Sequence, residues 1–200
     1  MSLTEKTEIT DKALIESHIR GDKSAFKQIV LRYSDGLYGY LYKMTGNKEQ
    51  TEDIFQETFK RVHEKAHTFG SGKFKAWLFK IATNLAMDSF RKQKKQPSTV
   101  SFARVSDESD CDLMDNCIAS DCSCGFAAAV EKEQVNIVRN AVNSLPYGQK
   151  TALVLTYYEN LSYAQAADIM GCSIGSVKSH ISRAMRKLAC ILPDPKGAEK

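Results

Sequence analysis

The chain has 200 residues, 42% hydrophobic and 26% charged, a composition typical of a globular protein with one or two domains. It contains no run of about 18 apolar residues, so we expect no membrane-spanning helix. The charged N-terminal segment does not resemble a secretory signal. We therefore expect a cytoplasmic protein whose six cysteines are mostly reduced.

The net charge of +4 conceals an uneven distribution of charge along the chain. Residues 1–95 contain 18 basic and 12 acidic side chains, and residues 130–200 contain nine and six. Between them, residues 96–129 contain one basic side chain, Arg104, and six acidic ones. Two basic blocks around an acidic one indicate a polyanionic partner, although an unevenly charged solvated surface would give the same counts.

The first block predicts three helices. Apolar residues recur every three or four positions from Ala25 to Met44, before a Thr-Gly-Asn break. A second helix is expected at about 52–66 and a third at about 75–94, ended by Pro97.

Periodicity is lost in residues 96–126, which are rich in Ser, Asp and Cys and are interpreted as a flexible acidic linker. Helices resume at about 126–143, 148–158, 162–170 and 174–191, and no strand-like segment is long enough to build a sheet. We predict an all-α fold with two helical domains. The expected boundaries are an N-terminal tail at 1–12, domains at 13–95 and 127–193 around the linker, and a C-terminal tail at 194–200.

The last two helices have the pattern of a helix-turn-helix. Ser162 is a good N-cap, Gly171-Cys172 forms a tight turn, and Ser173 caps a second helix. One stripe of that helix is apolar and is expected to pack inward: Val177, Ile181, Ala184 and Leu188. The opposite face suits entry into a DNA major groove and carries Lys178, Ser179, Ser182, Arg183 and Arg186. The alternative is an amphipathic surface helix without a role in DNA binding.

The helix at 75–94 carries a polar stripe of Lys80, Asn84 and Arg91, continued by Lys92. The aromatic residues Phe69, Phe74 and Phe79 lie in or near the loop that precedes and opens this helix. Basic side chains interleaved with aromatics fit single-stranded DNA with an unstacked base. The alternative is that these aromatic residues belong to the core.

Two motifs suggest metal sites. The segment from His63 to His67 spells HExxH, which holds catalytic zinc in metalloproteases when it lies on a helix, so a zinc hydrolase is a remote alternative. Four linker thiols form a second candidate site: Cys111, Cys117, Cys122 and Cys124. Their spacing is unlike the usual C-x2-C pairs, so four reduced cysteines without a metal are the favoured interpretation and no cofactor is expected. Cys172 and Cys190 are expected to be small core residues.

Taken together, these motifs resemble the extracytoplasmic-function (ECF) group of sigma factors in the sigma-70 family. Residues 51–61 look like the EDxxQExF signature, and residues 76–91 look like the WLxxIAxNxxxDxxR helix. Residues 145–146 and 161–184 resemble the LP…LSxxEIAxxxGxSxGTVKSRxxRA module. The chain departs from that last pattern at four positions, Lys150, Gln165, Ala166 and His180.

The resemblance implies a non-enzymatic subunit that binds core RNA polymerase and directs promoter recognition and transcription initiation. It implies docking on the clamp helices of the largest subunit and on the flap, with clamp docking through Asp53, Gln56, Glu57 and Phe59. Recognition of the −10 element is implied for Phe69, Phe74, Lys80, Asn84, Arg91 and Lys92, and of the −35 element for Ser176, Lys178, Ser179, His180, Ser182, Arg183 and Arg186. An anti-sigma factor is an expected partner. A stand-alone helix-turn-helix regulator is the main alternative.

Overall fold

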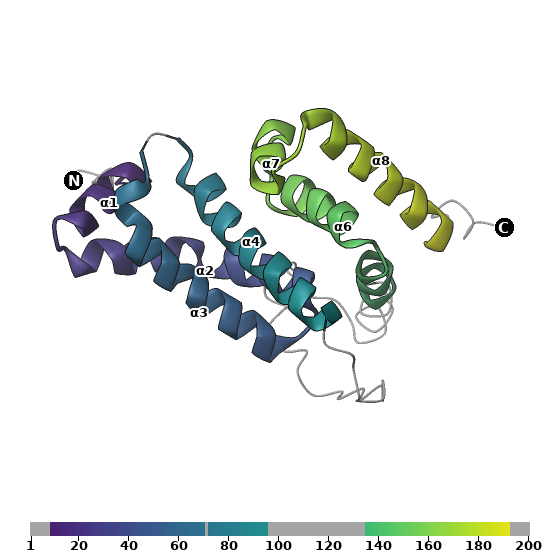
Figure 1. The fold of residues 1–200 in the computed structure, drawn as a ribbon, viewed down its shortest axis with the longest axis horizontal. Coiled ribbons are helices and arrows are strands. Elements are labelled where there is room, and N and C mark those ends of the chain that lie inside the picture. Colours follow the sequence, from purple (N-terminus) through teal and green to yellow (C-terminus); the bar gives the residue numbers. More distant parts are fainter. Residues whose placement is uncertain (1–8, 71, 96–134, 193–200) are drawn as a thin grey trace, which may run out of the picture.

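A computed structural model describes residues 9–70, 72–95 and 135–192, and these residues form helices with no strand among them. Figure 1 shows two groups of helices that meet along one side of α4 (Phe74–Lys95). The all-α class is confirmed, with two helical units on either side of residues 96–134. The predicted linker and its four cysteines lie outside the described residues.

The N-terminal module contains α1 (Asp11–Ile19), α2 (Lys23–Thr45), α3 (Lys48–Lys65), the short 3-10 turn η1 (Ala66–Thr68) and α4. Local side chains set its boundaries. The Asp22 carboxylate accepts from the Ser24 amide at 2.8 Å at the start of α2, and Asn47 does the same for Gln50 at the start of α3. Gly46 ends α2 in the left-handed region at φ 67°, a conformation that glycine adopts without steric cost. Helix α1 begins at Asp11, within the segment 1–12 expected as an N-terminal tail.

The C-terminal module begins with a helical segment at 135–143 and continues with α6 (Tyr147–Leu153) and the π-helical segment η3 (Val154–Tyr158). It ends with α7 (Tyr163–Met170) and α8 (Ile174–Ile191). A small core at one end of this module joins the 135–143 segment to α6 and α8 through Ala141, Val142, Leu145, Leu153, Ala184 and Leu188.

The main hydrophobic core is shared by both modules. It includes Tyr40 and Leu78 from the N-terminal bundle and Leu155 and Ile169 from the C-terminal module, all buried. At its centre the hydroxyl groups of Tyr40 and Thr83 are hydrogen-bonded at 2.7 Å. Burial raises the pKa of Tyr40 well above its ordinary value, so this phenol stays neutral. The two modules are therefore packed together over a common apolar layer.

Lys150 of α6 is a buried ammonium group within this contact. Its Nζ donates to the Asn143 side-chain oxygen at 2.8 Å and to the backbone oxygen of Met44, near the end of α2, at 3.4 Å. Among the described residues no carboxylate pairs with it. Burial lowers its pKa to about 8, because the charged form loses hydration that two neutral acceptors replace only partly.

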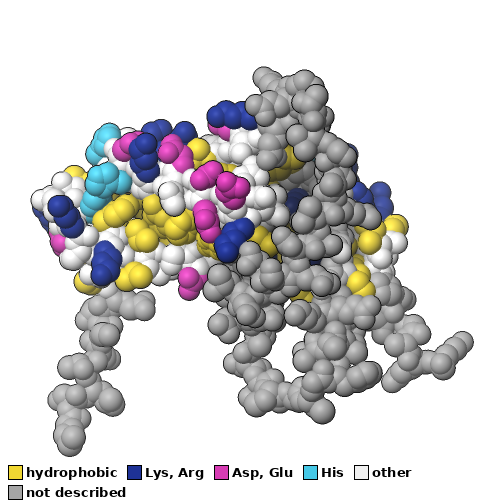
Figure 2. Space-filling view, turned by 90° about the horizontal axis from the view of Figure 1, so that it is seen from below, with side chains coloured by type: hydrophobic (Ala, Val, Ile, Leu, Met, Phe, Trp, Pro, Cys, Tyr) yellow, Lys and Arg dark blue, Asp and Glu magenta, His cyan; other side chains and the backbone are white. Residues whose placement is uncertain are grey.

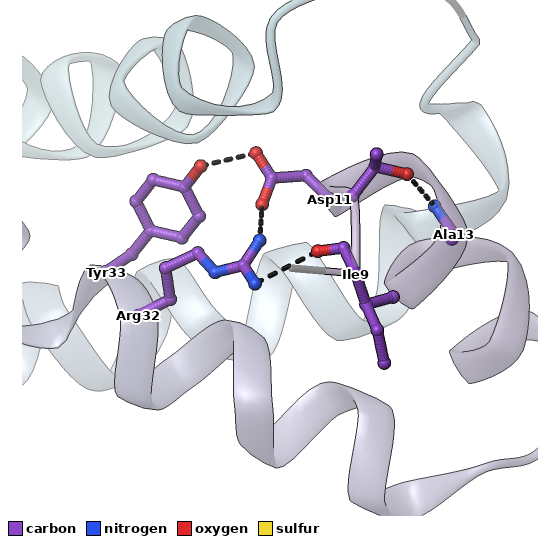
Figure 3. Close-up of polar contacts among 6 residues, drawn as sticks. Ile9, Asp11, Ala13, Arg32 and Tyr33 are labelled. Atoms are coloured by element: carbon purple, nitrogen blue, oxygen red, sulfur yellow. Dashed lines mark hydrogen bonds and ion pairs between the residues drawn. The ribbon is translucent and has the colours of Figure 1, made fainter. Parts of the chain in front are cut away.

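A polar clasp fastens α1 to α2 at the other end of the molecule (Figure 3). The Asp11 carboxylate accepts from Arg32 Nη1 and from the Tyr33 hydroxyl, each at 2.5 Å. Arg32 also donates from Nη2 to the backbone oxygen of Ile9 at 3.0 Å. Thr10 caps the same helix start by accepting from the Ala13 amide. The clasp holds the short helix α1 against the bundle.

We predict that Asp11→Ala lowers the free energy of unfolding by about 1–2 kcal/mol, because the partly buried Tyr33 hydroxyl and Arg32 lose a shared acceptor. Urea denaturation followed by circular dichroism measures this loss. Lys12→Ala is the control, since Lys12 is exposed and makes only a 3.9 Å pair with Glu16. An equal effect of the two substitutions would show that the clasp contributes nothing beyond helix propensity.

The second prediction concerns pH. The unfolded chain binds the Lys150 proton more tightly, with a pKa near 10.5, than the folded chain does with a pKa of about 8. This group therefore makes stability rise with pH, by about 1–2 kcal/mol between pH 8 and 9.5. Lys150→Met removes the titrating group, so the variant is expected to lack this rise in urea titrations at the two pH values. Parallel pH dependence in wild type and variant would contradict the assignment.

Candidate nucleic-acid and protein interfaces

One face of α3 combines exposed polar groups with aromatic side chains. Asp53 and Gln56 are exposed, whereas Glu57 is partly covered and paired with Arg61 at 3.0 Å and with Lys60 at 3.9 Å. Figure 2, which views the molecule from the side of α3, shows acidic side chains beside a hydrophobic area. The α3 face is thus a mixed acidic and apolar surface. Among the described residues, the Asp53 carboxylate has no ion-pair partner on it.

The aromatic residues of α3 form the floor of this face. Phe55 is partly buried between Tyr38 of α2 and Phe59, with ring centroids 5.9 and 5.1 Å away. Phe59 itself is 7% exposed and belongs to the core. Phe59 therefore supports the surface from the core. Its ring is too buried for the direct contact with a partner that the sequence analysis expects.

The loop before α4 closes on an aromatic cluster. Phe74 is buried against Phe69, Trp77 and Tyr33, with centroids 5.3–5.7 Å apart. Phe69 and Trp77 are only partly buried. Of the two aromatics expected to contact DNA, Phe74 is a core residue with no exposed ring surface, and Phe69 retains one.

The polar stripe of α4 is present, because the helix is continuous from Lys80 past Arg91. Asn84 and Lys92 are exposed, and Arg91 is exposed with Asp88 at 4.0 Å. The amide of Asn84 can donate and accept at the same time, as recognition of a base edge requires. The Lys80 ammonium group is already occupied by Asp168 of α7, at 2.9 Å.

The helix-turn-helix has the caps that the sequence predicts. Ser162 and Gln165 form a reciprocal capping box at the start of α7, and Gly171 ends that helix at φ 63°. Ser173 caps α8 by accepting from the Ser176 amide at 3.1 Å. The four residues of the inward stripe of α8 are buried, as expected: Val177, Ile181, Ala184 and Leu188.

The outer face of α8 is accessible to a partner. Five of the seven residues expected to read DNA are exposed on it: Lys178, Ser179, Ser182, Arg183 and Arg186. The other two are partly buried. Ser176 shares a hydrogen bond with Ser173 at 2.9 Å, and His180 packs on α6, where a Cβ added to Gly148 would lie 3.2 Å from the imidazole.

Two residues of the C-terminal module that contact α4 were not found by sequence reasoning. Glu159 and Asp168 face Lys75 and Lys80, whose sequence positions are more than 80 residues away. The sequence does single them out by composition, because they are the only acidic residues in the segment 135–192.

The HExxH segment does not form the helical pair that a zinc site needs. His63 lies on α3, but that helix ends at Lys65 and His67 belongs to η1. His63 contacts His18 and Phe26, and burial beside His63 lowers the pKa of His18. Within the described part of the chain, no group of three or more His, Cys, Asp or Glu could hold a metal ion. The zinc-hydrolase alternative is not supported.

Two further sequence expectations are tested by burial. Cys172 is partly buried and packs on the main core, whereas Cys190 is exposed, so its expected core position is wrong. None of the helices among the described residues is long and apolar enough to cross a membrane.

Comparisons with known proteins match both modules. Residues 29–96 match the family model of sigma-70 region 2, and residues 136–188 match that of sigma-70 region 4. The chain is 34% identical to the ECF RNA polymerase sigma factor SigW of Bacillus subtilis, over 94% of this chain and 99% of that protein.

Two solved structures are similar over most of the chain. One is CnrH in complex with the cytosolic domain of CnrY, at a TM-score of 0.64 and 25% identity, covering 90% of this chain and 95% of that one. The other is the sigma factor RpoE of Bartonella quintana with the anti-sigma factor NepR, at a TM-score of 0.60 and 26% identity, covering 83% and 95%.

Proposed function

The chain belongs to the ECF group of RNA polymerase sigma factors, and on this premise we propose that it binds core polymerase, recognises a two-part promoter and helps to open it. The observation that carries the proposal is that three accessible polar surfaces, on α3, α4 and α8, occur at the three motifs of the family. The chain itself catalyses no reaction in this role. It works in the cytoplasm with the polymerase.

The α3 surface is proposed to dock on the clamp helices of the polymerase. Asp53, Gln56 and Glu57 lie within about one turn, next to partly buried aromatic rings. Such a polar and acidic cluster at the edge of an apolar area fits a basic partner helix. Phe59 supports this surface from below.

The α4 surface is proposed to hold the melted −10 strand. Asn84 would contact an unstacked base, while Lys80, Arg91 and Lys92 would hold phosphates. Phe69 is partly exposed at the entrance to the helix and offers a ring for stacking, with Phe74 holding it from behind.

The α8 surface is proposed to bind the −35 duplex. Ser179 and Ser182 are short enough to approach base edges, and Lys178, Arg183 and Arg186 would bind the flanking phosphates. Ser176 and His180 contribute mainly by shaping the helix start and its packing on α6.

An anti-sigma factor is the proposed regulatory partner, because one of the two similar structures contains a sigma factor with the anti-sigma factor NepR. The acidic segment 96–126 is proposed to connect the two DNA-binding modules within the polymerase. A stand-alone helix-turn-helix regulator would leave the α3 and α4 surfaces without a use.

The decisive test is titration of core polymerase with Asp53→Lys. We expect at least a tenfold loss of affinity, because the reversed charge would face a basic helix. Asp53 is preferable to Glu57, whose substitution would also break two ion pairs within α3. Glu16→Lys is the matched control, since it makes the same charge change at an exposed position of α1.

Unchanged polymerase affinity in Asp53→Lys, with helicity preserved, would contradict docking through α3. Run-off transcription by core polymerase with and without the wild-type chain would report the proposed function as a whole. Lack of any stimulation across a library of promoters would contradict it.

For duplex DNA, we predict that Arg183→Ala lowers the slope of log affinity against log salt by about one, the value for a single lost phosphate contact. Fluorescence anisotropy with a labelled mixed-sequence duplex at several salt concentrations measures this slope. Arg139→Ala, in the 135–143 segment, removes a positive charge outside α8 and should leave the slope unchanged. Identical slopes in Arg183→Ala and wild type would remove Arg183 from the contact surface.

A further inference from the structure

The charges of the C-terminal module are distributed in an unusual way. Residues 135–192 contain six Lys and Arg but only two acidic residues, Glu159 and Asp168. Both acidic side chains face lysines of α4, a helix that itself carries an excess of positive charge. A basic module therefore approaches a basic helix through its only two described carboxylates.

Glu159 makes the more buried of the two ion pairs. Its carboxylate lies 3.2 Å from Lys75 Nζ with 9% of the side chain exposed, and its backbone oxygen accepts from the same Nζ at 2.7 Å. The π-helical segment η3 presents this residue, since the Glu159 amide donates to Val154 at 3.1 Å, five residues back. On α2, a Cβ added to Gly36 would lie 3.7 Å from Glu159 Oε2, so a residue without a side chain stands opposite the carboxylate.

Asp168 makes the more exposed pair, one turn and a half further along α4. Its carboxylate accepts from Lys80 Nζ at 2.9 Å, with the two side chains 69% and 42% exposed. Asp168 lies on α7, the first helix of the helix-turn-helix, so the DNA-reading unit itself makes this contact.

Neutral contacts extend the interface to the end of the proposed −10 helix. Tyr147 of α6 stacks on Phe90 with ring centroids 5.2 Å apart, and its hydroxyl donates to the backbone oxygen of Thr83 at 3.4 Å. Thr83 and Phe90 are the sequence neighbours of Asn84 and Arg91. In Figure 1, α6 and α7 accordingly lie along α4.

We propose that the C-terminal module is an intramolecular competitor of the promoter single strand, with the carboxylates of Glu159 and Asp168 occupying positions on Lys75 and Lys80 that DNA phosphates would take. The inference rests on the proposed function of α4. In the closed chain two cations of α4 are neutralised and one flank of the helix is covered. Strand binding and closure exclude each other. The apparent affinity of the free chain for the strand is therefore the affinity of the open form multiplied by the fraction of molecules that are open. Separation of the modules on the polymerase would then expose α4 only where it is used.

The experiment compares the wild-type chain with the double variant Glu159→Gln/Asp168→Asn. The double variant keeps the shape of both side chains and removes both charges. Small-angle scattering is expected to show a larger radius of gyration, and anisotropy with a labelled 20-nucleotide random-sequence single strand is expected to show about fivefold or greater tightening. The matched control is Glu16→Gln/Glu64→Gln, which removes two exposed carboxylates on α1 and α3. It should leave the radius unchanged and tighten strand binding far less.

Three further variants locate the effect. Adding Lys75→Ala and Lys80→Ala to the open variant should abolish the gain in affinity, which would place the strand on α4 and not on α8. Asp168→Lys should expand the chain and Lys80→Asp/Asp168→Lys should contract it again, a readout that needs no DNA. Because the Lys80–Asp168 pair is exposed, these last two variants are expected to retain wild-type helicity.

An equal gain in strand affinity in the test and control double variants would overturn the proposal, because net charge alone would then explain the gain. An unchanged radius of gyration in Glu159→Gln/Asp168→Asn, with unchanged strand affinity, would overturn it as well. Run-off transcription by the wild-type chain separates the two levels of inference. If the wild-type chain supports transcription but the expanded double variant binds the strand no more tightly, the competition would be overturned and the sigma function would stand.

Discussion

The whole arrangement depends on helix α4, which has to pack on two modules while keeping a polar stripe. Its apolar side is buried in the N-terminal bundle through Leu78, Phe79 and Ala82. Thr83 on the same side is hydrogen-bonded to the buried Tyr40 hydroxyl, which fixes the rotation of the helix about its axis. Because the rotation is fixed, Asn84 and Arg91 are forced outward and Lys75 and Lys80 face the C-terminal module.

The contact between the modules combines an apolar layer with ion pairs of different strength. The exposed Lys80–Asp168 pair is worth about 0–1 kcal/mol, as is usual for surface pairs. In the Lys75–Glu159 pair the Glu159 side chain is 9% exposed and that of Lys75 36%, so loss of Lys75 would leave a buried, uncompensated carboxylate and cost more than the intact pair contributes. Lys150 adds a buried charge with only neutral acceptors. Because both modules also share the main hydrophobic core, their separation would expose buried apolar side chains to water.

Sequence periodicity and capping predicted the local structure of the helix-turn-helix correctly, whereas α1 was not among the predicted helices. The inward stripe of α8, the caps at Ser162 and Ser173 and the turn at Gly171 all occur as expected, because each depends on residues within about four positions of one another. The predictions for single side chains were weaker. Phe59 and Phe74 have the aromatic character of contact residues but are buried, and Cys190 was expected in the core but is exposed. A helical stripe gives the direction of a side chain and not what covers it.

The sequence by itself determined the helical class, the order of the helices after α1, the helix-turn-helix and the motif positions by which the family is recognised. Only the tertiary structure decided which charges meet. Lys75 pairs with Glu159 and Lys80 with Asp168 across more than 80 residues, and the π-helical segment that presents Glu159 has no local signature among Val154–Tyr158. The physical reason is that helix periods and caps arise from interactions between near neighbours in sequence. Pairing between modules depends instead on the packing of two complete helical units, which no short stretch of residues specifies.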